Sequence, residues 1–127
     1  MNNLNSVLVE GSLVRDAEVK TLGNGSMVCN FSIATNRYYK KNENFEKETS
    51  YFDVQAWGKL AEACGSKGQK GRWVRVVGRL KQDRWATQDG KSMSKIIIVP
   101  DHVEFRQKKD EQDIPPPDNA NINRIPF

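Results

Sequence analysis

The chain has 127 residues and a formal net charge of +4. This length suits one domain with a hydrophobic core that needs no disulfide bonds, and the mild basic excess excludes a histone-like polycation. No apolar run approaches the length of a membrane-spanning helix, and the N-terminus lacks a signal-peptide core, so we expect a soluble, cytoplasmic protein with reduced thiols. Two cysteines and one histidine do not make a recognisable zinc ligand set, and we expect no metal.

The first half of the chain consists of short strands separated by turn signals. Ser6–Val14 alternates and is predicted as a strand, which Ala17–Thr21 continues. Asn24-Gly25 then predicts a hairpin turn into a strand over Met27–Asn36. The residues of Arg37–Thr49 are polar and charged, so they predict a long hairpin tip without a core of its own.

The second half contains three more predicted strands and the only predicted helix. The strands are Tyr51–Trp57, Trp73–Gln82 and Met93–Val99, and the short helix is Lys59–Ser66. Asp83–Ser92 is a second long polar tip between the last two strands. Three strands, one helix and two strands are the order of an all-β, five-stranded Greek-key barrel of the OB-fold type, with the helix between strands 3 and 4.

Side-chain alternation separates the strand Tyr51–Trp57 into two faces. The apolar face is predicted to build the core and carries Phe52, Val54 and Ala56. The opposite face carries two aromatics, Tyr51 and Trp57, and two polar residues between them. Exposed aromatics on a strand of a basic protein favour a base-stacking platform. Packing under a loop or in a subunit contact is the alternative for this pair.

Basic residues gather in one part of the chain. The segment from Lys59 to Lys95 contains ten basic and three acidic residues, a net charge of +7. On the strand Trp73–Gln82, the basic side chains share a face with Trp73, and Val74, Val76 and Leu80 share the predicted core face. Such a cluster is the electrostatic footprint of a protein that binds a polyanion.

The composition changes from Arg106 onward, where apolar periodicity stops and Pro115-Pro116-Pro117 appears. We therefore predict a folded domain over residues 1–105 and a disordered tail over residues 106–127. The tail ends in Ile125-Pro126-Phe127, although no core needs a phenylalanine there. This end is either a hook for a pocket on a partner or an accident of the chain end.

Several short segments follow one another in a fixed order. They are Val7–Asp16, Asn24-Gly25, Asn30–Thr35, Trp57–Glu62, Lys70–Val74, Gly78–Leu80, and Trp85 before Asp89-Gly90. In order and spacing they resemble bacterial single-stranded DNA-binding protein over residues 4–105, with a further match at the C-terminal tip. The resemblance implies a homotetramer of OB-folds that binds single strands without sequence preference, with no catalytic activity and no cofactor.

The resemblance also implies particular site residues. Its stacking aromatics fall on Tyr39, Tyr51, Trp57 and Trp85. We further expect eight cations to neutralise phosphates, which makes binding depend on salt: Arg37, Lys40, Lys41, Lys59, Arg75, Arg79, Lys81 and Arg84. Replication, recombination and repair in the bacterial nucleoid are the processes that the resemblance implies.

The C-terminal tip of the family recruits replication and repair enzymes through an acidic run followed by a hydrophobic residue, proline and phenylalanine. Ile125, Pro126 and Phe127 match the last three positions. The acidic run is absent, because Asn121, Asn123 and Arg124 stand in its place. The resemblance implies partner binding by this tip, with a smaller charge complement to a basic pocket.

Three alternative functions would also account for these residues, and each makes a different prediction. An OB-fold that binds RNA would be separated from a DNA-binding one by competition between matched oligonucleotides. A nuclease would need clustered carboxylates for metal ions, whereas Asp53 and Glu62 are isolated. A pure assembly protein would use the aromatics for self-association, and its oligomer size would not respond to oligonucleotide.

Overall fold

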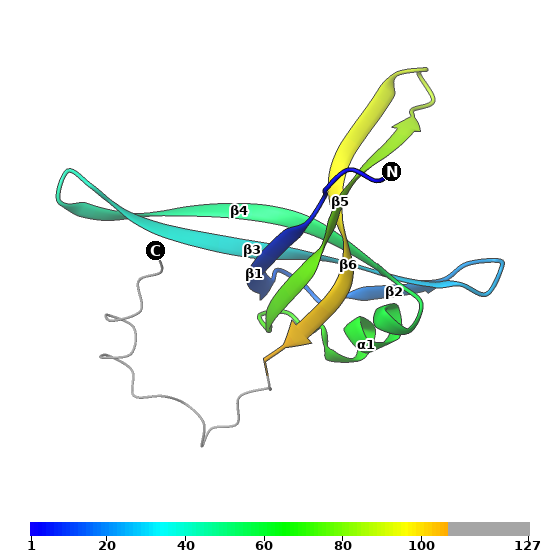
Figure 1. The fold of residues 1–127 in the computed structure, drawn as a ribbon, viewed down its shortest axis with the longest axis horizontal. Helices are drawn as coiled ribbons and strands as arrows, with labels where there is room; N and C mark the ends of the chain where they lie inside the picture. The colour runs from blue at the N-terminus through cyan, green and yellow to red at the C-terminus, as the bar shows by residue number, and fades with distance from the viewer. Residues whose placement is uncertain (107–127) are drawn as a thin grey trace.

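Antiparallel strands close into a barrel in the computed structural model, which describes residues 1–106 (Figure 1). Six strands and one helix follow one another in the chain: β1 (Val7–Leu13), β2 (Glu18–Thr21), β3 (Met27–Lys41), β4 (Asn44–Trp57), α1 (Lys59–Lys67), β5 (Trp73–Ala86) and β6 (Ser92–Phe105). The four residues of β2 continue the course of β1, as predicted, so the two count as one barrel strand. The all-β Greek-key barrel with a helix between its third and fourth strands is therefore confirmed.

The barrel closes where β1 meets β3. The strand order is β1-β5-β6-β4-β3-β2, and an additional pairing joins Ser12 to Ala34 and Leu13 to Ile33. A side chain on Gly11 would overlap the backbone of Ala34, so glycine permits this close approach. The parallel pairing of Val54 in β4 with Ile98 in β6 completes the circle.

The core lies inside the barrel and under the helix. Cys29 is fully buried, and α1 adds Ala61 and Cys64 to the same cluster. Burial raises the pKa of the Cys64 thiol to about 12, so this thiol stays protonated and unreactive at neutral pH. In the described part of the chain, no helix has the length and apolar character to cross a membrane.

The polar tips over residues 37–49 and 83–92 are hairpins whose strands stay paired up to the turn, so these strands run further than their predicted ends. The β3–β4 ladder continues to the pair Lys41 and Asn44, around a turn in which Asn42 and Glu43 have positive φ. The β5–β6 ladder continues to the pair Ala86 and Ser92. The two hairpins project from the barrel in different directions (Figure 1).

The continuation of these strands beyond the barrel explains two errors in the predicted core. Leu80 and Phe52 carry apolar side chains on the core face of their strands, yet they are 43% and 36% exposed. Both lie where a hairpin leaves the barrel, and alternation assigns a residue to a face without showing whether another layer covers it.

Gly78 lies at the register shift between β5 and β6, and we expect Gly78→Ala to destabilise the fold. A Cβ there would lie 2.7 Å from the Cα of Pro100, against backbone that cannot rotate away. We expect the free energy of unfolding to fall by about 1–3 kcal/mol, as for other overpacked sites. Urea unfolding at fixed protein concentration measures this change.

Gly23→Ala is the matched control, since a Cβ on Gly23 meets nothing within 4 Å. Its free energy of unfolding should stay within about 0.5 kcal/mol of the original chain. Equal unfolding midpoints for the two variants would contradict the close approach at Gly78.

Candidate nucleic-acid interface

The outer face of the β3–β4 hairpin carries the aromatic pair that the sequence singled out. The β3–β4 ladder has no register shift, so its side chains alternate regularly from the barrel to the turn. Trp57 lies opposite Val28 and Tyr51 lies opposite Ala34, with exposed fractions of 41% and 68%. The predicted exposure of this pair is confirmed, and both rings have a face available to a ligand.

The two neighbouring tyrosines of β3 lie on different faces of the hairpin. Counted along the ladder, Tyr38 shares the face of Tyr51, whereas Tyr39 lies on the opposite face. The Tyr39 hydroxyl donates a hydrogen bond of 3.1 Å to Glu46, and the Arg37 guanidinium lies 4.9 Å from the centroid of its ring. The hydrogen bond to Glu46 raises the pKa of Tyr39. Stacking by Tyr39 stays a prediction, and Tyr38 is an aromatic of this face that sequence reasoning missed.

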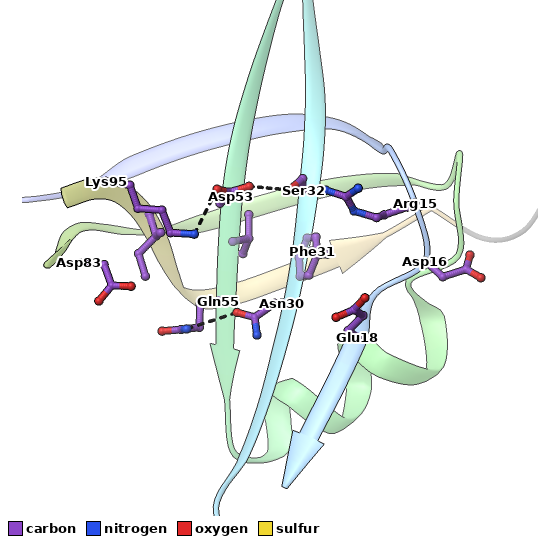
Figure 2. Close-up of a pocket in the computed structure, with 12 residues that line it drawn as sticks. Arg15, Asp16, Glu18, Asn30, Phe31, Ser32, Asp53, Gln55, Asp83 and Lys95 are labelled. Atoms are coloured by element: carbon purple, nitrogen blue, oxygen red, sulfur yellow. Dashed lines mark hydrogen bonds and ion pairs between the residues drawn. The ribbon is translucent and has the colours of Figure 1, made fainter. Parts of the chain in front are cut away.

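Polar side chains occupy the strip between Tyr51 and Trp57. The Ser32 hydroxyl donates a hydrogen bond to Oδ1 of Asp53, and Nζ of Lys95 lies 3.6 Å from Oδ2 of the same carboxylate. One ladder pair further on, Nε2 of Gln55 donates to Oδ1 of Asn30 at 3.3 Å. Figure 2 shows these groups side by side along β3 and β4, with Lys95 reaching over from β6.

These polar residues line a pocket of about 370 Å³. Its walls come from the β1–β2 connection and from β2, β3, β4, β5 and β6 (Figure 2). Four carboxylates line it, and two cations oppose them: Asp16, Glu18, Asp53 and Asp83 against Arg15 and Lys95. Within residues 1–106, no three His, Cys, Asp or Glu side chains come together in a way that would hold a metal ion.

The β5–β6 hairpin extends this surface. Trp85 is 44% exposed and lies opposite Met93 in the ladder. Because alternate residues of a strand share a face, Trp85 and Lys81 lie on the same side of β5 as Asp83, which lines the pocket. Asp83 and Asp53 line the same pocket. The surface that carries Trp85 is therefore continuous with the polar strip between Tyr51 and Trp57.

The eight predicted phosphate-binding cations fall into two groups. Arg37 lies 3.6 Å from Glu48, and Arg75 lies 3.3 Å from Glu10 and 4.0 Å from Glu104. The other six are exposed and form no ion pair with the residues of segment 1–106: Lys40, Lys41, Lys59, Arg79, Lys81 and Arg84. The structure leaves the charge of these six free for a polyanion.

Comparisons with known proteins agree with this geometry. Residues 4–106 match the model of the single-strand binding protein family. The chain is 37% identical over 122 residues to the single-stranded DNA-binding protein of Aquifex aeolicus, covering 89% of this chain and 82% of that protein. It is 38% identical over 105 residues to the single-stranded DNA-binding protein of Treponema pallidum, covering 83% of this chain and 59% of that protein.

One solved structure shows the same fold. The Plasmodium falciparum SSB in complex with ssDNA matches with a TM-score of 0.76 and 21% sequence identity, covering 84% of this chain and 97% of that chain. At 21% identity, this similarity shows that the two chains share the barrel fold and its connections.

Proposed function

The chain belongs to the single-strand binding protein family, and from this premise we propose that it binds and protects single-stranded DNA during replication, recombination and repair. The observation that carries the proposal is the exposed pair Tyr51 and Trp57, on a surface that continues to Trp85. Both hairpins also carry exposed cations that form no ion pair within residues 1–106. The proposed activity is binding alone, without catalysis, in the cytoplasm at the nucleoid.

The mechanism combines stacking with neutralisation of phosphates. Each base that stacks on an aromatic contributes about 1–3 kcal/mol, and stacking tolerates any sequence because every base has a π-face. The phosphates then lie along the free cations of the hairpins, which releases counterions and makes the affinity fall with salt. A duplex keeps its bases stacked inside, so it contacts the cations without using the aromatics.

A titration of intrinsic tryptophan fluorescence tests the proposal. Oligo(dT) is expected to quench the emission of Trp57 and Trp85, because both indoles are exposed on the proposed surface. A duplex of equal length is the control and should give little quenching at the same salt. An equal response to both, or no response to either, would show that the basic surface is a general polyanion patch and that the aromatics serve packing.

We further propose that the protein assembles as a homotetramer. One edge of β1 pairs with β5 from Val7 to Ser12, but on its other side β1 pairs with β3 only at Ser12 and Leu13. Because the Thr35 hydroxyl also donates to the carbonyl of Glu10, the edge that stays open among the described residues is Val7–Val9. An open edge is a template for pairing with another chain. Leu8, 69% exposed beside Val77, adds apolar surface at that edge.

Residues 1–105 are proposed as the DNA-binding and assembly domain, and residues 106–127 as a tail that recruits replication and repair proteins. The tail residues beyond Arg106, with the tip Ile125, Pro126 and Phe127, lie outside the described residues. The proposal for the tip rests on its three-residue match to the tip of the family.

A further inference from the structure

The polar pocket beside Asp53 has an arrangement that base stacking does not explain. Resting on the proposed function, we infer that this pocket takes the Watson–Crick edge of one unpaired base and prefers guanine, with Asp53 and Lys95 as the reading residues. Binding then remains tolerant of sequence at the aromatic platforms but discriminates between bases at this one position.

The pocket lies between the two exposed aromatics of β4. Asp53 lies on β4 between Tyr51 and Trp57, and alternation places all three side chains on one face. A strand of nucleotides that stacks on those two aromatics must pass over Asp53. The pocket volume, about 370 Å³, falls in the range of sites that take small organic ligands.

The charge of the pocket lining is negative. The lining carries twice as many carboxylates as cations, which repels a phosphate. The free cations lie elsewhere, along the hairpins and at Lys59. What enters the pocket is therefore the neutral part of a nucleotide that offers hydrogen-bond donors, and that part is the base.

Asp53 and Lys95 keep hydrogen-bonding capacity that a ligand can use. The Ser32 hydroxyl fixes the Asp53 carboxylate by donating to Oδ1, but each carboxylate oxygen has a second lone pair. At 3.6 Å from Oδ2, the Lys95 ammonium forms an ion pair but is too distant for a good hydrogen bond. Both side chains are 49% exposed, so their hydrogen-bonding capacity faces the pocket and solvent.

The order of donors and acceptors selects the base. Read across the pair, Lys95 offers a donor, and Oδ2 and Oδ1 of Asp53 offer two acceptors. Guanine presents the complement on its Watson–Crick edge: the O6 acceptor, the N1–H donor and the N2 amino donor. Thymine matches the first two positions, but its O2 then faces a carboxylate oxygen, and two acceptors repel each other.

Competition between matched oligonucleotides tests the inference on the full-length protein. One competitor is oligo(dT) with isolated guanines, and the other carries inosine at the same positions, which removes only the N2 amino group. Each displaces labelled oligo(dT). We expect the guanine competitor to act at a concentration at least about tenfold lower, as for one lost hydrogen bond to a charged acceptor.

Two isosteric variants separate base reading from pocket charge. Asp53→Asn exchanges one acceptor for a donor and should bring the ratio of guanine to inosine competition to about one. Asp83→Asn removes the same charge from the same pocket and should leave that ratio unchanged. A ratio of one in the original chain, or a ratio that survives Asp53→Asn, overturns the guanine pocket while binding to oligo(dT) still supports the proposed function. No binding to any single strand overturns both.

Discussion

Replacing Trp57 and Trp85 together by alanine is expected to weaken binding of oligo(dT) at least about 30-fold at fixed salt, because each lost base stack costs about 1–3 kcal/mol. The two indoles lie on different hairpins, so their effects should add. Each single variant is expected to lose about half of the binding free energy that the double variant loses. Fluorescence polarisation of a labelled oligonucleotide measures all three variants without relying on the indoles that are removed.

The fold should survive these substitutions. Both side chains are more than 40% exposed, and neither belongs to the buried cluster of the barrel. The matched control is the replacement of both residues by phenylalanine, which keeps a π-face and should retain most of the affinity. Equal losses for the alanine and phenylalanine variants would place the contribution of these residues in packing rather than in stacking.

The exposure of Tyr51 and Trp57 was predictable because it depends on one strand only. Side-chain alternation holds within any regular strand, and seven residues suffice to assign both aromatics to one face. The placement of Tyr38 and Tyr39 was not predictable in this way. It depends on where the β3–β4 ladder turns, at Asn42 and Glu43, and the polar sequence of the hairpin gives no apolar pattern that fixes this register.

The order of the barrel strands was predictable from turns and apolar runs, but the lengths of the strands were not. Beyond the barrel, the hairpin ladders pair mostly polar residues through their backbones, such as Arg37 with Glu48 and Lys41 with Asn44. A strand without a buried face has no hydrophobic periodicity, so its sequence resembles that of a loop.

The polar pocket was out of reach of sequence reasoning for a different reason. Ser32, Asp53 and Lys95 come from three strands, and only the closed barrel brings them together. From the sequence alone, Asp53 was an isolated acid. The same limit applies to the cations, since Glu10 lies far from Arg75 in the chain and yet faces it across the β1–β5 ladder.

The ion pairs of Arg37 and Arg75 lead to a prediction about how the affinity for DNA depends on salt concentration. Each phosphate that the protein neutralises on a single strand makes the slope of log affinity against log salt more negative by about 0.7. If the six free cations each neutralise one phosphate, the slope is about −4, and a rise in salt from about 50 to about 200 mM weakens binding about 300-fold. Titrations of oligo(dT) over this range of salt give the slope directly.

Two variants with the same change of charge then test whether the ion pairs matter. Lys81→Gln removes a free cation and should make the slope shallower by about 0.7. Arg75→Gln should leave the slope unchanged, because a phosphate would have to displace Glu10 and Glu104 from this guanidinium. A slope that falls equally in both variants would mean that DNA opens the ion pairs of Arg75 on binding. Arg75 would then count with the six free cations, as the sequence alone suggests, and the surface that the strand follows would extend over β1 and the end of β6.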